Sequence, residues 1–224
     1  MATLDNDVSQ VDKTEVKIMD RAIYREGLKT YKQRLGGRGP CRESSVSIEQ
    51  YTAFIVAVVD LDEIYVGLAV WGPNADRIIK NKAFQGVAFG PDGRITTVEM
   101  KGPPTFAVWL AAFRVFRVAC VMKAIVEPET LDNYIAKIEK LHAKNPRCWA
   151  LLYQAEHRTR LEHMPRVRDA MQEEHDDAIH DGKHPDRLPF NPKQPWEGVF
   201  QRVTFEEKDW WDEQYNDLCF LYYL

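Results

Sequence analysis

Apolar residues recur at helical spacing near the start of the chain, which predicts a helix over residues 12–34. The residues that set this spacing are Val16, Met19 and Ile23. Gly27 weakens the middle of this helix, because glycine is a poor helix former. The following stretch, LGGRGPCRESS, is rich in glycine and ends it. Residues 1–12 are polar and lack an apolar run, so we expect a disordered tail there.

A second helix is predicted over residues 47–60. The pattern Ser47-Ile-Glu-Gln50 is a capping box, and apolar residues follow it at helical spacing. These residues are Ile48, Tyr51, Ile55, Val58 and Val59. Because the same stretch is rich in Val and Ile, a strand remains an alternative.

The β signal is confined to residues 64–100. The run Ile64-Tyr-Val-Gly-Leu-Ala-Val-Trp71 predicts a strand, which Gly72-Pro73 ends. Residues 85–89 and 94–98 predict the two strands of a hairpin, because the turn sequence Gly90-Pro-Asp-Gly93 lies between them.

From residue 104 onward the pattern is helical. In the first helix large apolar residues fall at steps of three and four, which predicts one continuous aromatic face. This face consists of Phe106, Trp109, Phe113, Phe116 and Cys120. Pro128 suits the first turn of the next helix, which Asn145-Pro146 ends. The apolar side of that second helix consists of Leu131, Tyr134, Ile135, Ile138 and Leu141.

The stretch Pro146–Met164 predicts another helix, which Pro165 interrupts or kinks. Its buried side consists of Cys148, Leu151, Leu152 and Ala155. A polar helix follows from Arg166 to about His180, and a short helix is predicted over Trp196–Val203. The C-terminal tail is too apolar to remain in water, so we expect it to dock on the core or on a partner.

Together these elements predict a mainly α (α+β) protein. We expect the tail at residues 1–12, then an N-terminal portion at 13–103 with a basic helix and a small α/β part that holds the hairpin. Residues 104–224 are expected to form a C-terminal helical bundle. The chain has 224 residues, of which 45% are hydrophobic, so it has enough apolar material for a packed core.

The most hydrophobic segment, residues 105–126, has the length to cross a bilayer, but Arg114 and Arg117 fall inside it. At a bilayer centre each arginine would cost about 2.5–3.5 kcal/mol, so a buried core helix is expected instead, and no membrane partner. The four cysteines are far apart in sequence and form no C-x-x-C pair. With no signal-peptide pattern visible, this predicts reduced cysteines in an intracellular protein, cytoplasmic or nuclear.

Charge is distributed unevenly, although the net charge is only −4. Residues 21–42 hold seven basic residues against one acid, whereas residues 169–186 hold seven acids against one base. Basic groups with Tyr24 and Tyr31 between them suit phosphate contact and base stacking. The candidate nucleic-acid-binding residues are Lys17, Arg21, Arg25, Lys29, Lys32, Arg34, Arg38 and Arg42. The alternative is a solvated basic helix without a ligand.

The stretch Cys148–Met164 contains residue types that metal and catalytic sites use. His157 and His163 are six residues apart, about 120° around a helix, so they cannot share one metal ion. Two pairs of glutamate and arginine have i, i+4 spacing, a pattern typical of a solvated helix face. These pairs are Glu156–Arg160 and Arg158–Glu162. We therefore expect the side chains of residues 104–164 to exclude water from a core rather than to hold a reactant.

The acidic segment 175–186 offers a different interpretation. Asp176 and His180 have i, i+4 spacing and His184 can fold back toward them, which suits a zinc-like ion in a metal-dependent hydrolase. The composition is that of an exposed linker without apolar surroundings, so we expect no metal, no cofactor and no catalytic residue. Cys41 lies in a polar, basic setting, but no histidine is near it in sequence to form a catalytic pair.

An ordered series of packing motifs runs through the second half of the chain. It includes Gly102-Pro-Pro, Trp109-Leu-Ala-Ala-Phe-Arg114, Pro128-Glu-Thr-Leu-Asp132, Cys148-Trp-Ala-Leu-Leu and Pro195-Trp-Glu-Gly-Val-Phe200. Over residues 99–203 this series resembles gag-like, capsid-type regions of retroelement polyproteins of unicellular algae. The resemblance implies a structural protein that self-associates and contacts RNA. The chain lacks the C-x₂-C-x₄-H-x₄-C zinc knuckle of a full gag pattern, so RNA binding by that route is not expected.

The sequence therefore predicts a non-enzymatic, gag-like assembly protein. We expect a homo-oligomer that associates through its aromatic C-terminal elements and contacts RNA phosphates through residues 13–42. No small-molecule substrate is evident. Two alternatives stay open: a metal-dependent hydrolase that uses residues 175–186, and a plain protein–protein adaptor.

Overall fold

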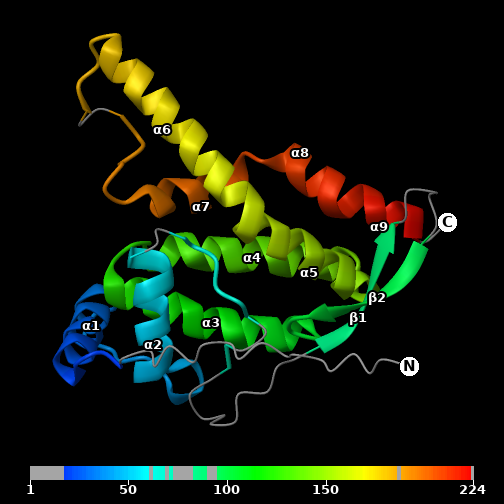
Figure 1. The fold of residues 1–224 in the computed structure, drawn as a ribbon, viewed down its shortest axis with the longest axis horizontal. Helices are drawn as coiled ribbons and strands as arrows, with labels where there is room; N and C mark the ends of the chain where they lie inside the picture. The colour runs from blue at the N-terminus through cyan, green and yellow to red at the C-terminus, as the bar shows by residue number, and fades with distance from the viewer. Residues whose placement is uncertain are drawn as a thin grey trace, which may run out of the picture.

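The protein is described by a computed structural model. The residues that it describes are 18–60, 63–68, 71–72, 83–89, 95–185 and 188–222, so the predicted tail at residues 1–12 lies outside them. Most of these residues are helical, and strands β1 (Ala83–Phe89) and β2 (Ile95–Lys101) form an antiparallel hairpin (Figure 1). The predicted fold class, mainly α with a small hairpin in the N-terminal portion, is confirmed.

Helix α1 (Arg21–Arg34) begins later than the pattern predicts, because the Asp20 side chain caps it by accepting a hydrogen bond from the Ala22 amide at 2.8 Å. Residues 18–20 precede the helix, and residues 12–17 lie outside the described residues. α1 packs against α3 (Phe106–Lys123), which lies on its inner side (Figure 1).

Gly27 faces this helix contact, and the space around it explains why a glycine stands in the middle of α1. A Cβ atom at this position would lie 2.8 Å from Tyr51 Oη and 3.0 Å from Met122 Cε. Glycine therefore lets the backbone approach two core side chains, which offsets its poor helix propensity.

Residues 48–60 are helical rather than extended. α2 (Ile48–Phe54) starts with the predicted capping box, because the Ser47 hydroxyl accepts from the Gln50 amide at 3.1 Å and the Gln50 side chain accepts from the Ser47 amide at 2.9 Å. The helix continues as a π-helix over Ile55–Asp60. The helical alternative for this stretch is thus confirmed.

The strand predicted over residues 64–71 is wrong in the part that the structure describes, because residues 63–68 form no strand. Ile64, Val66 and Leu68 are all buried, so the burial alternates as it does in a strand. These side chains are buried in the core although the segment pairs with no strand that the structure describes. The Val66 carbonyl accepts a hydrogen bond from Arg160 instead of from a neighbouring strand.

The predicted hairpin is confirmed, with Ala83 opposite Lys101 and Phe89 opposite Ile95. Its turn sequence at residues 90–93 lies outside the described residues. The hairpin is anchored on α5 (Trp149–Arg158), since the Phe84 ring packs edge-on against Tyr153 at a centroid distance of 5.7 Å.

α3 lies at the centre of the fold and is buried on most sides. Its aromatic face is confirmed: the rings of Trp109 and Phe113 stack at a centroid distance of 4.9 Å, and Phe113 stacks on Tyr134 at 5.4 Å. Arg117 reaches the surface and forms a bidentate ion pair with Asp132. No helix in the described part of the chain is long and apolar enough to span a membrane.

α4 (Pro128–Lys144) starts at the predicted proline and buries the predicted apolar side, with Ile135 partly buried at its margin. After a short 3₁₀ turn, α5 runs into a π-helix over Thr159–His163 and then into α6 (Met164–His180), so that Figure 1 shows one long helical path. The Met164 amide bonds to the Thr159 carbonyl, five residues back. The chain accommodates Pro165 by this wider turn and not by a break.

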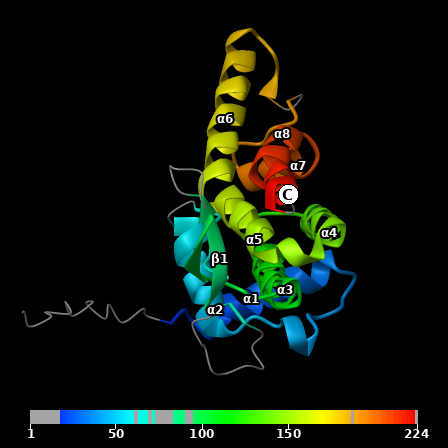
Figure 2. The same ribbon diagram turned by 90° about the vertical axis from the view of Figure 1, so that its right-hand side faces the viewer.

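The C-terminal tail docks on the core, which is one of the two predicted outcomes. It follows α7 (Pro195–Phe205), the predicted short helix, and consists of α8 (Lys208–Trp211), a π-helix over Asp212–Asn216 and α9 (Asp217–Tyr222). Trp211 and Tyr215 are fully buried, and the Tyr215 hydroxyl donates to the Leu141 carbonyl at 3.1 Å. One core includes these residues together with Tyr31 of α1, so it crosses residue 104. Figure 2 shows α1 beside α3, the helix at the centre of this core.

The prediction that both glutamate–arginine pairs of α5 face solvent is wrong for one of them. The side chains of Glu156 and Arg160 are 0% exposed, whereas those of Arg158 and Glu162 are 49% and 38% exposed. The sequence spacing fixes which residues pair, but it does not tell which side of the helix other elements cover. Here Tyr65 and Val66, which lie far before the helix in sequence, contact Arg160 of the first pair.

The buried pair is satisfied by hydrogen bonds. Arg160 Nε and Nη2 donate to the two Glu156 oxygens at 2.6 and 3.1 Å, and Nη1 donates to the Val66 carbonyl at 2.9 Å. The guanidinium also lies over the Tyr65 ring, 5.3 Å from its centroid. Burial alone lowers the pKa of Arg160, but the Glu156 charge and its hydrogen bonds raise that pKa above its ordinary value, so the guanidinium stays charged.

Breaking this pair will destabilise the protein far more than breaking its exposed neighbour. Glu156→Gln leaves a buried guanidinium without a counter-charge, and we expect the free energy of unfolding to fall by about 3–5 kcal/mol. Glu162→Gln is the matched control on the same helix and should cost at most about 0.5 kcal/mol. Urea unfolding measures both, and equal losses would contradict the account of the buried pair.

Three histidines inside the helical region predict how stability depends on pH. His142 stacks on Phe106, the His157 ring lies 2.9 Å from the Tyr65 hydroxyl, and His163 stacks on Trp210 beside Glu207. Burial lowers the pKa of each imidazole below its ordinary value of 6.5, although Glu207 partly opposes this for His163. The folded state therefore binds fewer protons than the unfolded state in this range.

We expect the free energy of unfolding to fall as the pH is lowered from 7.5 to 5.5, since protonation of these histidines favours the unfolded chain. Urea unfolding at both pH values measures the change. His142→Phe should reduce the pH dependence, because it removes one of the three groups. Stability that is unchanged or greater at pH 5.5 would refute this assignment.

Candidate nucleic-acid interface

The predicted basic residues lie on α1 and on the loop that follows it, except Lys17, which is outside the described residues. α1 lies at the edge of the molecule, where it packs against α3 and also contacts α2 (Figure 1). The exposed cations of this segment are Arg21, Arg25, Lys29, Lys32, Arg38 and Arg42. They are called the basic face below.

The loop after α1 turns back on the helix. Gly36 and Gly37 have φ values of 60° and 85°, in the left-handed region that favours glycine, and the Gly37 amide donates to the Lys32 carbonyl at 2.7 Å. A Cβ atom on Gly39 would lie 3.6 Å from Lys32 Cε. The loop that carries Arg38 thus packs against the side chain of Lys32, an exposed cation of the helix.

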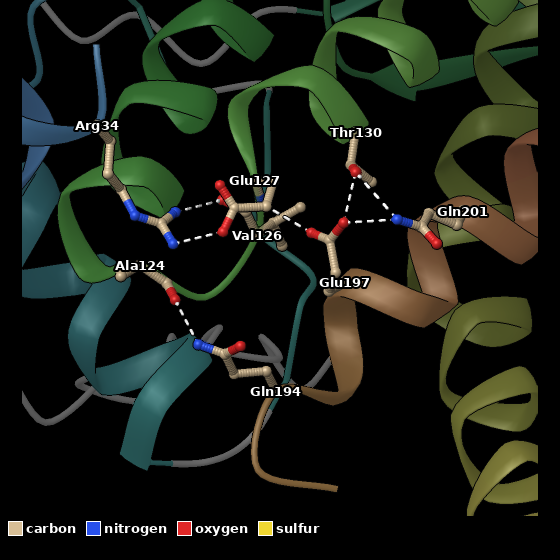
Figure 3. A network of polar contacts seen from close by, with 8 residues as sticks. All are labelled: Arg34, Ala124, Val126, Glu127, Thr130, Gln194, Glu197 and Gln201. Atoms are coloured by element: carbon tan, nitrogen blue, oxygen red, sulfur yellow. Dashed lines mark hydrogen bonds and ion pairs between the residues drawn. The ribbon is translucent and has the colours of Figure 1, made fainter. Parts of the chain in front are cut away.

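Arg34 is engaged within the fold and does not belong to the basic face. Its Nη2 atom donates to Glu127 Oε1 at 2.6 Å and its Nη1 atom donates to the Val126 carbonyl at 3.4 Å (Figure 3). The side chain is 22% exposed. Arg34 therefore fixes the C-terminal end of α1 to the connection between α3 and α4.

The Arg34 contact is part of a wider polar network that α7 completes. The Glu197 carboxylate accepts from the Glu127 amide at 2.7 Å and from the Thr130 hydroxyl at 2.5 Å (Figure 3). Because Glu127 has no side-chain cap of its own, Glu197 caps α4 from another helix. Gln201 supports this carboxylate with a hydrogen bond of 2.7 Å. α4 and α7, which are distant from α1 in sequence, thus form the network that holds the C-terminal end of α1.

A pocket of about 430 Å³ lies between α1 and the start of α2. Its lining residues are Arg21, Tyr24, Arg25, Leu28, Ser47, Ile48 and Glu49. The Tyr24 ring is fixed, because its hydroxyl donates to the Val46 carbonyl at 2.7 Å and the ring meets Tyr51 edge-on at 6.0 Å. Burial raises the pKa of Tyr24, with a further contribution from the Glu49 charge, which keeps the phenol neutral.

The pocket lining contains charged residues of both signs, Arg21, Arg25 and Glu49, which form no ion pair with one another. Within the described part of the chain, no ion pair joins Arg21, Arg25 or Glu49 to another residue. The two arginines are four residues apart on α1, so they lie on one face of the helix. As far as the described residues go, the pocket therefore offers two unpaired cations and one unpaired carboxylate to a ligand.

The sequence pattern predicts the residues of the basic face and Tyr24, but it does not predict the contribution of α2 to the pocket. Glu49, Ile48 and Ser47 follow the basic segment in sequence and carry no basic or aromatic signal. The second tyrosine that was expected to stack on a base, Tyr31, is 6% exposed and belongs to the core. Of the two expected tyrosines, the pocket therefore contains Tyr24.

The other chemical candidates do not assemble among the residues that the structure describes, where no three His, Cys, Asp or Glu side chains form a metal-binding group. Asp176 accepts a hydrogen bond from Gln172, and His175 packs beside Phe190. Asp186 lies outside the described residues. The cysteines are free, with Cys41 exposed and the other three buried.

Comparisons of the chain with protein-family models, with curated proteins and with solved structures find no match. The gag-like relationship of residues 99–203 therefore stays a prediction based on the motifs quoted above.

Arg34 and Arg38 are both candidate RNA-binding residues in the sequence, but their substitution should change the free energy of unfolding by different amounts. Arg34→Gln removes the bond to Glu127, and we expect the free energy of unfolding to fall by about 1 kcal/mol, because the pair is partly exposed. Arg38→Gln removes an exposed side chain and should change it by less than about 0.5 kcal/mol. Urea unfolding tests both variants, and an equal effect would contradict the different roles assigned to them.

Proposed function

We propose that this protein is a non-enzymatic assembly protein that binds RNA through the basic face. The observation that carries the proposal is the set of exposed cations on α1 and its loop, held on a helix that Gly27 and Arg34 fix to the core. From Lys29 to Arg42 the chain contains no acidic residue. A rigid array of this kind neutralises successive phosphates and releases their counterions.

Preorganisation supports the same function. Long cationic side chains lose rotamer freedom on binding, but the backbone of α1 is already ordered by capping and by packing on α3. Binding by this face is expected to depend strongly on salt and weakly on sequence, because phosphate contacts carry no base information.

The second part of the proposal is self-association. Fewer C-terminal aromatic residues are exposed for contact with a second copy than the sequence alone indicates. Trp211 and Tyr215 pack within the core of the same chain. Phe205 and Phe220 are 67% and 68% exposed and stay available for a second copy.

Fluorescence anisotropy of a labelled single-stranded RNA, titrated at several salt concentrations, tests RNA binding. We expect Arg38→Gln with Arg42→Gln to weaken binding and to reduce the slope of log affinity against log salt by about 1.4, or about 0.7 per lost phosphate contact. Lys140→Gln with Lys193→Gln removes two exposed charges elsewhere and should leave both quantities unchanged. No binding by the unaltered protein at low salt, or an equal loss in the control, would refute the proposal.

A further inference from the structure

The pocket between α1 and α2 has an acidic residue in its lining, Glu49, which phosphate binding alone does not require. Arg21 and Arg25 repel a cationic ligand, and Glu49 repels a ligand that is only anionic. A ligand that satisfies all three must carry negative charge at one end and N–H donors at the other. A nucleotide has this combination, in its phosphate and the edge of its base.

The volume and the apolar lining of the pocket agree with a nucleotide. The volume of about 430 Å³ lies within the range of small-molecule sites, roughly 300–1,000 Å³. Leu28 and Ile48 supply apolar contact, and the fixed Tyr24 ring supplies an aromatic surface that loses little freedom when a base stacks on it. The pocket therefore suits one base that has left the stack of its strand.

The carboxylate of Glu49 identifies the base. A carboxylate has two oxygens side by side and acts only as an acceptor. On its Watson–Crick edge guanine presents two adjacent donors, N1–H and N2–H, whereas adenine, cytosine and uracil each place an acceptor beside their donor. We infer that this pocket binds one unpaired guanine of the RNA, with Glu49 accepting from its base edge and with Arg21 and Arg25 holding its phosphate. The inference rests on the proposed function, because the remaining affinity comes from the basic face.

The test uses nine-nucleotide oligouridylates with guanine, inosine or adenine at the centre, and fluorescence anisotropy with the full chain. We expect guanine to bind about tenfold more tightly than adenine, as for one bidentate base contact, with inosine between them because it lacks the N2 amine. Annealing each oligonucleotide to its complement should abolish the preference, since pairing occupies the same edge.

Glu49→Gln should bring the three affinities to within about twofold of one another, because an amide cannot accept both N–H groups. Glu26→Gln makes the same charge change on an exposed residue outside the pocket lining and should keep the preference for guanine. Thermal unfolding of both variants verifies that they are folded. This control separates a direct base contact from a general change in charge.

Each remaining outcome decides against the inference in a distinct way. Equal binding of the three oligonucleotides by the unaltered protein would overturn the guanine site and leave the proposed function in place. A Glu49→Gln variant that binds all three more tightly, with the preference intact, would show that Glu49 only repels phosphate. No binding of any oligonucleotide at low salt would end both the inference and the proposed function.

Discussion

The guanidinium of Arg160 has no access to water, so protein groups must make the hydrogen bonds that water would otherwise provide. Glu156 supplies two acceptors and the Val66 carbonyl supplies a third. An ion pair in such surroundings is tolerated only when these contacts are complete, because the cost of removing two charges from water is large. The segment 63–68 must therefore lie against α5 and the π-helix that follows, which joins the N-terminal part of the chain to the C-terminal helices.

The same core positions the surface that we propose to be functional. α1 reaches α3 closely because Gly27 has no side chain, and Arg34 ties the end of the helix to a network that includes α4 and α7. The exposed cations Arg21, Arg25, Lys29 and Lys32 are thus carried by a helix whose backbone has little freedom left to lose. A flexible basic tail would lose conformational entropy when it binds RNA, whereas this helix loses that entropy when the protein folds.

Features that depend on local pattern could be predicted from the sequence. The aromatic face of α3, the capping box of α2, the hairpin and the helix at residues 195–205 each have a periodicity or turn signal of their own. Features that depend on contacts between distant elements could not be predicted from the sequence. The apolar run at residues 64–68 has the composition of a strand but finds a helix as its neighbour. The burial of Glu156 and the contribution of Glu49 to the pocket likewise arise from contacts between distant segments.

The basic face is firmly attached to the protein only if α1 and α5 belong to one cooperative core. Native-state hydrogen exchange measures this through the opening free energies of backbone amides such as those of Leu28 in α1 and Leu152 in α5. We expect both amides to exchange through the same global unfolding, with opening free energies that agree and that respond equally to denaturant. An α1 amide that opens at a much lower free energy than the α5 amide would contradict the account, because the basic face would then be only loosely attached to the core.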